Sequence, residues 1–180
     1  KRQIMIVCAG RTELFKFATT IGVGLIESAY NLSRILKDNK PDKLLFIGSC
    51  GSYGSLGMLE SFYSESAFQV EHSLLSDKAY TPIENKIIKN VSHETIVNSS
   101  NYITVDKEVS YKFLEFGADA ENMEFYSVLW AAKEAGVEAK GFFVVTNYCF
   151  ENAREEYAAN LKAATEIIYD RYEKELKEYE

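Results

Sequence analysis

The sequence holds few residues of the kinds that bind metals or form disulfides. It has three cysteines and two histidines among 180 residues. Cys8, Cys50 and Cys149 lie far apart, each in or beside an apolar run, and neither a CxxC nor a Cys/His spacing occurs. Because His72 and His93 also stand alone, a structural zinc site and a disulfide scaffold are disfavoured. Three buried, reduced thiols are expected, with no metal and no organic cofactor.

Basic residues are also scarce. Lys and Arg number 20 against 27 Asp and Glu, and the net charge of −7 disfavours nucleic acids and anionic membranes as partners. No apolar run is long enough to span a bilayer and no signal peptide precedes the first expected strand, so a cytoplasmic location is expected. Few arginines are available to form a local anion site. They are Arg2, Arg11, Arg34, Arg154 and Arg171.

Apolar and aromatic residues, in contrast, are plentiful. Hydrophobic residues make up 47% of the chain and aromatic residues 13%, with 12 Tyr and 11 Phe beside one Trp. A chain of this length and composition can build one well-buried core, so a single domain over residues 1–180 is expected. The aromatic rings either fill that core or form the walls of a site for flat ligands.

Hydrophobic periodicity predicts strands that alternate with helices. The expected strands cover residues 3–9, 14–21, 43–47 and 141–146, with a strand tendency in 59–70, 87–97 and 102–105. The expected helices cover 25–36, 108–115, 120–135 and 151–180, with a surface loop over 73–85. This order predicts an α/β fold of three layers, with a mixed, mostly parallel, twisted sheet flanked by helices. Ligands bind beyond the carboxyl ends of such strands, here 9–11, 48–52 and 146–147.

Gly48-Ser49-Cys50-Gly51 directly follows the expected strand 43–47. Glycines at a strand end let backbone N–H groups approach a ligand, and the Ser49 hydroxyl adds a further donor. This combination suits an anion or a hydroxyl-rich small molecule. The same residues also suit a simple turn of the chain, and both readings stay open.

Glu121-Asn122-Met123-Glu124 lies at the start of the expected helix 120–135. Capping and the helix dipole account for an acidic residue at Glu121. Glu124 lies at the margin of the buried side, where a carboxylate could accept two hydrogen bonds from a vicinal diol, and Met123 could pack under a sugar ring. An ordinary helix-margin carboxylate is the equal alternative.

Three segments, taken in order, resemble the superfamily of purine nucleoside phosphorylases and methylthioadenosine nucleosidases. Thr20 to Ala29 is similar to its GIGKVNAA strand-to-helix turn, and Ile47 to Ser52 to its Gly-Ser/Thr-Cys/Ala-Gly phosphate loop. Glu121 to Glu124 resembles its EMEA ribose motif, with Asn122 inserted or substituted. Asn98 to Ile103 is similar to its SGDxFI segment. The order and spacing of these motifs, more than any one of them, carry the resemblance.

The resemblance covers roughly residues 14–180 and implies a phosphorylase/hydrolase-like fold. It also implies a role for each matched residue. Gly48 and Ser49 would contact phosphate or the nucleophile. Met123 would pack beneath the ribose, and Glu124 would bind the 2′- and 3′-hydroxyls.

The resemblance further implies a site for the base. Tyr102 would stack on the purine. Thr146 and Asn147 would lie where the family carries Ser-Asp, facing the N7 edge. An aspartate there can protonate a 6-aminopurine, whereas an asparagine has no titrating proton but can bond N7 and O6 of a 6-oxopurine. The alternative for Asn147 is a residue that only ends its strand and caps backbone groups.

Two departures from the family bear on the phosphate. The bacterial phosphorylases have an arginine where this chain has Phe46, and the region before the GIG-like turn is shorter than theirs. Arg11 is the best substitute anion contact, with an ordinary surface arginine as the alternative. A homo-oligomer, a dimer or a trimer of dimers, is expected to complete the site, and Arg34 could reach a neighbouring subunit.

The predicted function is that of a purine nucleoside phosphorylase. Inorganic phosphate would be the co-substrate, and 6-oxopurine nucleosides such as inosine and guanosine would yield the free base and ribose 1-phosphate. Catalysis would rest on Asn147 and Glu124. One alternative is a nucleosidase that uses water in place of phosphate. Another is a catalytically silent family member that binds a nucleoside.

Overall fold

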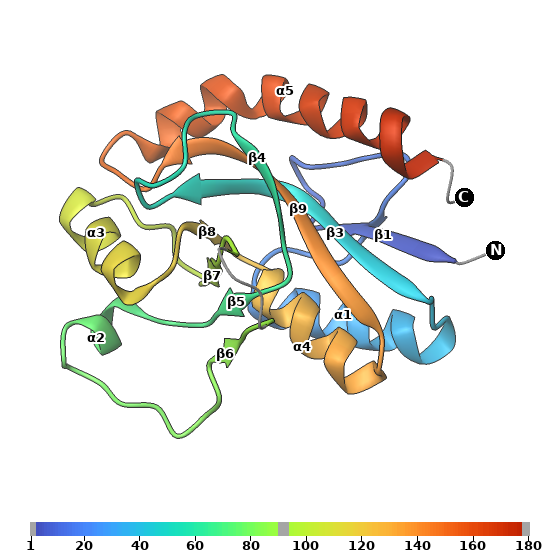
Figure 1. The fold of residues 1–180 in the computed structure, drawn as a ribbon, viewed down its shortest axis with the longest axis horizontal. Coiled ribbons are helices and arrows are strands. Elements are labelled where there is room, and N and C mark those ends of the chain that lie inside the picture. The colour runs from blue at the N-terminus through green and yellow to red at the C-terminus, as the bar shows by residue number, and fades with distance from the viewer. Residues whose placement is uncertain (1–2, 90–93, 178–180) are drawn as a thin grey trace.

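The computed structural model describes residues 3–89 and 94–177. A mixed β-sheet lies between helices on both of its faces (Figure 1). The strands are β1 (Ile4–Cys8), β2 (Thr19–Thr20), β3 (Lys43–Ser52), β4 (Ser61–Ser64), β5 (Ala67–Phe68), β6 (Lys86–Ile87), β7 (Val97–Ser99), β8 (Ala120–Asn122) and β9 (Glu138–Tyr148). The helices are α1 (Leu25–Asp38), α2 (His72–Leu75), α3 (Lys107–Phe116), α4 (Phe125–Ala135) and α5 (Ala153–Arg171), which continues as a π-helical segment, Tyr172–Leu176.

The sheet is organised around β3. β1 and β9 lie parallel to β3 on its two sides, β2 continues the sheet beyond β1, and β4 pairs antiparallel with β9. β8 pairs antiparallel with the last two residues of β3, and β7, β5 and β6 follow outward. The carboxyl ends of β1, β3 and β9 therefore point in the same direction.

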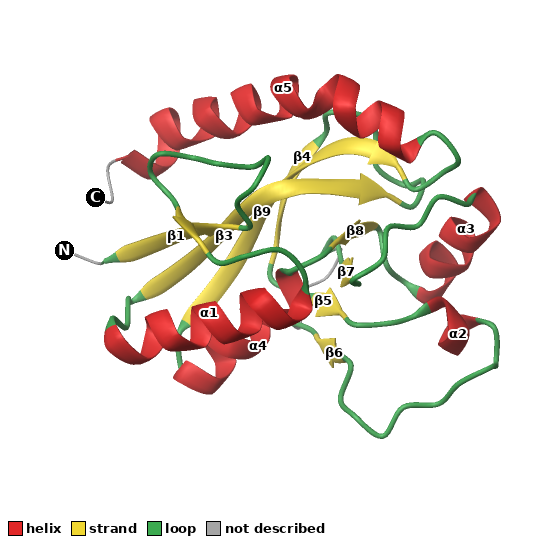
Figure 2. Ribbon diagram, turned by 180° about the vertical axis from the view of Figure 1, so that it is seen from behind, coloured by secondary structure: helices red, strands yellow, loops and turns green. Residues whose placement is uncertain are grey.

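Successive side chains of β3 fill two separate cores. Leu44 and Phe46 belong to the core under α1 and α4, whereas Leu45 and Ile47 belong to the core under α5. Figure 2 shows α5 over one face of the sheet and α1 with α4 over the other. Because side chains alternate between the two faces of a strand, a continuous apolar run is what a strand covered on both faces requires. The α/β fold class and the three-layer arrangement are confirmed.

The predicted strand over residues 14–21 is wrong for most of its length. Only Thr19–Thr20 pairs with β1. The preceding residues form turns, because Phe15 and Phe17 pack their rings against Tyr169 near the end of α5. Contacts between aromatic rings on the α5 side of the sheet, and not strand pairing, therefore fix the position of this segment.

The predicted helix over 120–135 begins five residues too early. Ala120–Asn122 forms β8, which pairs with both β3 and β7, and the helix begins at Phe125. The Asn122 side chain accepts hydrogen bonds from the backbone N–H groups of Glu124, the N-cap residue, and of Phe125, the first residue of the helix. Glu121 is therefore a buried strand residue and owes nothing to a helix dipole.

Other boundaries shift as well. Residues 48–52 belong to β3 and form no separate loop, while 102–105 forms a loop and no strand. The segment 87–97 contributes strand residues only at its two ends, and its residues 90–93, with His93, lie outside the described part. The last expected helix runs as α5 from Ala153, and its residues 178–180 also lie outside.

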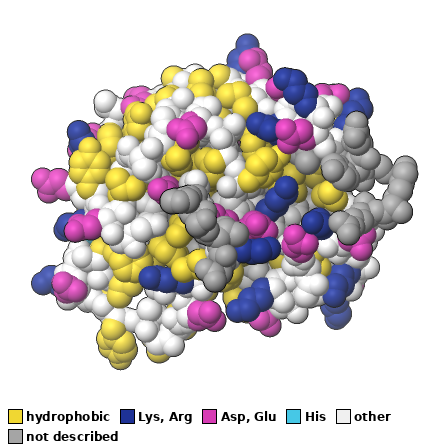
Figure 3. All heavy atoms as spheres, in the orientation of Figure 1, with side chains coloured by type: hydrophobic (Ala, Val, Ile, Leu, Met, Phe, Trp, Pro, Cys, Tyr) yellow, Lys and Arg dark blue, Asp and Glu magenta, His cyan; other side chains and the backbone are white. Residues whose placement is uncertain are grey.

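The cysteines, the surface charges and the helices can be compared with what the composition predicts. Cys8, Cys50 and Cys149 are all buried and free. On the face drawn in Figure 3, basic and acidic side chains lie interspersed. Among the described helices, none combines the length and apolar character that a bilayer crossing requires.

A glycine in β9 tests the packing of the sheet against α4. A Cβ added to Gly141 would lie within 2.8 Å of the Phe125 and Phe143 rings, both of which are fully buried. We expect Gly141→Ala to lower the free energy of unfolding by about 1–3 kcal/mol through overpacking. Gly57→Ala is the matched control, because its nearest neighbour, Glu60, would be 3.5 Å away. Equal urea midpoints for the two variants would contradict this packing.

Candidate active site

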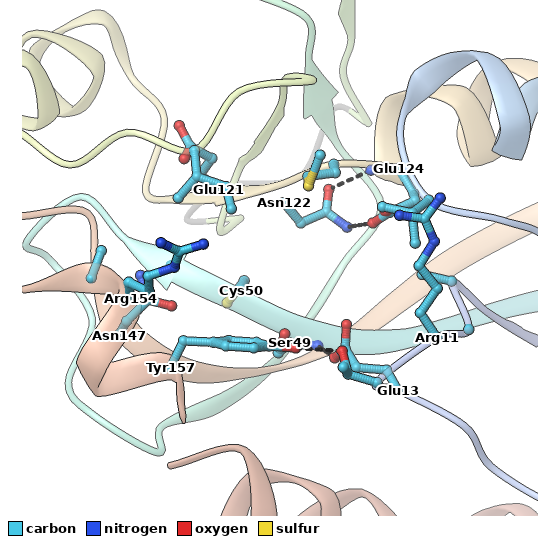
Figure 4. A pocket seen from close by; sticks show the side chains of 18 of the residues that line it. Arg11, Glu13, Ser49, Cys50, Glu121, Asn122, Glu124, Asn147, Arg154 and Tyr157 are labelled. Atoms are coloured by element: carbon cyan, nitrogen blue, oxygen red, sulfur yellow. Dashed lines mark hydrogen bonds between the residues drawn. The ribbon is translucent and has the colours of Figure 1, made fainter. Parts of the chain in front are cut away.

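A pocket of about 580 Å³ opens at the carboxyl ends of β1, β3 and β9. Its wall includes residues 9–13 after β1, 49–51 of β3, 121–124 at and after the end of β8, and Asn147 with residues of the first two turns of α5. Val23, Ile103 and Val105 complete the lining. The three strand ends singled out from the sequence thus each contribute to this pocket. Of the predicted site residues, it brings together Arg11, Ser49, Met123, Glu124 and Asn147 (Figure 4).

The carboxylate of Glu13 reaches into this pocket and bonds to β3. Its Oε1 atom accepts a hydrogen bond of 2.6 Å from the backbone N–H of Ser49. A turn directs it there: Gly10 has φ 96°, Arg11 has φ 58°, and the Glu13 N–H donates to the Gly10 carbonyl. A positive φ at a non-glycine residue is unfavourable, and such backbone positions concentrate at functional sites.

The sheet register explains why the Ser49 N–H is available. β3 pairs with β1 only over Lys43 to Phe46, and with β8 only at Gly51 and Ser52. The edge between these two pairings has no strand partner, and Glu13 supplies the missing acceptor. Burial raises the pKa of Glu13, and the hydrogen bonds from Ser49 partly offset this rise.

Glu124 is the second carboxylate of the pocket. It is 5% exposed, and its Oε1 and Oε2 atoms accept hydrogen bonds from the Gly24 N–H at 3.1 Å and the Asn122 amide at 3.2 Å. Gly24 lies in the glycine turn before α1, so this turn holds the carboxylate. Burial, together with the charge of Glu13, raises the pKa of Glu124 to about 7. The hydrogen bond from Gly24 lowers this pKa and offsets part of the rise.

Asn147, the penultimate residue of β9, has its amide oxygen already bonded. The hydroxyl of Thr146 donates to Asn147 Oδ1 at 3.0 Å, and Asn147 Nδ2 donates to the Tyr148 carbonyl at 3.0 Å. One N–H of the amide is left for a ligand. Thr146, which was also predicted to bind substrate, is fully buried outside the pocket lining, and it contacts the site through the hydrogen bond to Asn147.

Two further predicted contacts lie elsewhere. Tyr102 is 84% exposed and lies outside the pocket lining, where Ile103 and Val105 are found instead. Gly48 lies within β3 against the ring of Phe46, and that ring is buried in the core. These positions give no support to base stacking by Tyr102 or to a phosphate contact by Gly48.

Two of the predicted cations are already engaged. Arg11 is exposed at the rim of the pocket, 3.7 Å from the carboxylate of Glu27. Arg34 lies on α1 with its guanidinium over the ring of Tyr30, and it does not line the pocket.

Glu13, Arg154 and Tyr157 are among the lining residues that sequence reasoning missed. Tyr157 on α5 forms a hydrogen bond of 2.8 Å with Thr12, which ties the turn after β1 to the helix. Glu13 could have been found from its position just after a predicted strand end. Arg154 could have been found because the chain has only five arginines, but its position within a charged helix face predicts a solvent-exposed residue.

Glu121 anchors the loop that forms one wall of the pocket. It is 5% exposed and accepts hydrogen bonds from the Tyr53 hydroxyl at 2.6 Å, the Thr104 N–H at 2.8 Å and the Thr104 hydroxyl at 2.7 Å. Burial raises the pKa of Glu121, and these hydrogen bonds offset part of that rise. Because Thr104 lies between Ile103 and Val105, this carboxylate fixes two lining residues.

Comparisons with known proteins identify the fold. No family model and no curated protein matches the sequence. Three solved structures with the same fold are a futalosine hydrolase mutant of Helicobacter pylori, a nucleosidase mutant of Helicobacter pylori with 5′-methylthioadenosine in its active site, and an S-adenosylhomocysteine nucleosidase of Streptococcus pyogenes.

The likeness spans nearly the whole chain. The TM-scores are 0.77, 0.75 and 0.73 at sequence identities of 17%, 17% and 12%. Each match covers 92% of this chain, and 94%, 94% and 92% of the three neighbours. The chain therefore has the fold of these three proteins. Among the described residues, no group of three or more His, Cys, Asp or Glu side chains is arranged to hold a metal ion.

A threonine variant tests the anchoring of the wall loop. Thr104→Val removes a hydroxyl that donates to buried Glu121 while keeping the branched shape. We expect a loss of about 1–3 kcal/mol in the free energy of unfolding, as for hydrogen bonds to charged groups. Thr19→Val, at an exposed strand position, is the matched control. Urea denaturation measures both, and a Thr104→Val midpoint equal to the control would show that the bond contributes nothing.

Proposed function

We propose that this protein is a purine nucleosidase, which cleaves the N-glycosidic bond of a nucleoside with water as the nucleophile. The observation that carries the proposal is the Glu13 carboxylate bonded to the Ser49 N–H. This amide is one of the groups from which a phosphate site was predicted. The fold shared with three nucleosidases and the sequence resemblance to the superfamily support the same reading.

The charge of the pocket disfavours phosphate as the nucleophile. Phosphate would have to bind beside Glu13, and two unit charges 4 Å apart repel by about 4 kcal/mol at an effective dielectric constant of 20. The cations predicted to contact phosphate are engaged or missing, and the remaining lining cation, Arg154, lies on the side of Asn147, across from Arg11. Arg11 faces Glu27, and Phe46 replaces the family's arginine with a buried ring.

Water needs a base, and Glu13 supplies one. As the water oxygen bonds to C1′, its proton passes to the Glu13 carboxylate, and the C1′–N9 bond breaks with its electron pair on the purine. A general base works best with a pKa near the working pH, and burial moves the pKa of Glu13 in that direction. The Ser49 N–H fixes the orientation of the carboxylate.

The ribose and the base bind on either side of this water. Glu124 accepts hydrogen bonds from the 2′- and 3′-hydroxyls, and Met123 packs beneath the ring. Holding the sugar in this way favours the oxocarbenium character of the transition state. Asn147 donates its remaining N–H to the N7 or O6 edge of a 6-oxopurine such as hypoxanthine.

Product analysis tests the reaction type. We expect the purified protein to release hypoxanthine from inosine at a rate that does not depend on phosphate. Glu13→Gln should lower kcat by about 10²–10⁴-fold, because the base is lost while the hydrogen bond to Ser49 can still form. Chromatography of the free base, with and without phosphate, measures both.

Glu155→Gln, an exposed acidic residue of α5 outside the pocket lining, is the matched control. It should leave kcat unchanged. Release of base only with phosphate would indicate a phosphorylase instead. Nucleoside binding without any release by the unmodified protein would indicate a silent binding protein.

The pKa of Glu124 predicts a pH dependence of binding. The ionised carboxylate accepts hydrogen bonds from both ribose hydroxyls, and the protonated form accepts them less well. Affinity for a C-nucleoside analogue of inosine, which resists hydrolysis, should therefore rise as the pH increases through about 7. Titration calorimetry between pH 6 and pH 8 measures this rise.

The 2′,3′-dideoxy form of the same analogue isolates the effect of Glu124. Because it lacks both hydroxyls, its affinity should not change with pH in this range. Glu124→Gln should likewise remove the dependence for the full analogue. The same rise for both analogues would show that another group titrates, and would contradict the ribose assignment.

A further inference from the structure

Arg154 places a guanidinium group in the same pocket as Asn147. It is the second residue of α5 and lines the pocket. Figure 4 shows its side chain extending from α5 into the pocket on the side of Asn147, across from Arg11. The purine end of the proposed site therefore contains a permanent positive charge.

This guanidinium has no protein partner among the residues that the structure describes. Arg11 pairs with Glu27, Arg171 pairs with Glu175, and Arg34 lies over a tyrosine ring. Arg154 forms neither an ion pair nor a side-chain hydrogen bond within the described ranges. In a chain of net charge −7, an unpaired cation facing a pocket is available to a ligand.

The backbone of Arg154 is held firmly relative to Asn147. Ala153, the residue before it, is 1% exposed. Glu156 accepts a hydrogen bond of 2.8 Å from the Tyr148 N–H, and the Asn160 amide donates to the Thr146 carbonyl at 3.0 Å. The first two turns of α5 are thus fixed to the end of β9, so the guanidinium stays at the base end.

The proposed reaction needs a positive charge at this point. When the C1′–N9 bond breaks, the purine takes the electron pair, and negative charge spreads towards N7 and O6. Asn147 has no titrating proton, and one of its two N–H groups is occupied by the Tyr148 carbonyl. Charge that develops in a transition state is stabilised most by groups already fixed in place.

Building on the proposed function, we infer that Arg154 is a catalytic residue that stabilises the departing purine as an anion. The guanidinium donates hydrogen bonds to O6 and N7 while the C1′–N9 bond breaks, and the released purine anion then takes a proton from solvent. Arginine has five N–H donors and no acceptor. Its donors can therefore bind O6 and N7 of a 6-oxopurine, which are both acceptors, whereas the 6-amino group of adenine is a donor and cannot accept a hydrogen bond from arginine.

A change of leaving group tests the inference. We expect Arg154→Ala to lower kcat for inosine by about 10²–10³-fold, as for loss of a fixed donor to a developing oxyanion. With p-nitrophenyl β-D-ribofuranoside the loss should be far smaller, because nitrophenolate leaves without assistance. Arg154→Lys should keep part of the inosine activity, since a positive charge remains. The inosine-to-adenosine activity ratio should fall in Arg154→Ala.

Lys162→Ala, an exposed basic residue of α5 outside the pocket lining, is the matched control and should change neither rate. Inosine activity that survives Arg154→Ala would overturn this inference and leave the nucleosidase proposal standing. Equal losses with both substrates would also overturn it, since they would indicate a structural role. An unmodified protein that cleaves neither substrate would overturn both the inference and the proposed function.

Discussion

The hydrogen bond from the Ser49 N–H to the Glu13 carboxylate is the interaction on which the site depends. It exists because β3 extends beyond β1 and leaves one edge without a strand partner before β8 begins. The Glu13 carboxylate fills that gap. The glycine-rich segment after residue 47 was predicted to bind an external anion, but its Ser49 N–H binds a carboxylate of the protein itself.

The remaining site follows from the same arrangement. β9 lies parallel to β3 and places Asn147 opposite Gly51, two residues after Ser49. The first two turns of α5 then bring Arg154 and Tyr157 to the same pocket. The opposite wall comes from the end of β8 and from Glu124, which directly precedes α4. Acidic groups thus gather where water and ribose would bind, and Arg154, which has no partner within residues 3–89 and 94–177, lies where the purine would leave. This separation of charge matches the charge separation of glycosidic cleavage.

Much of the fold was predictable because strand patterns are local. The apolar runs of β1, β3 and β9 predict buried strands, and the resemblance pointed to Glu124 and Asn147, which line the pocket. Glu13 was not predictable, because its direction depends on the backbone of Gly10 and Arg11 and on a gap in strand pairing. The start of α4 was missed because Ala120–Asn122 fits a helical period, yet pairing with β3 and β7 prevails.

The source of the oxygen on C1 of the ribose tests the central claim most directly. Inosine is cleaved in H₂¹⁸O with excess inorganic phosphate, and the sugar product is analysed by mass spectrometry. If Glu13 activates water, the product is free ribose with one ¹⁸O atom at C1, even at saturating phosphate. Ribose 1-phosphate without the label would show that phosphate enters beside Ser49, and would contradict the account.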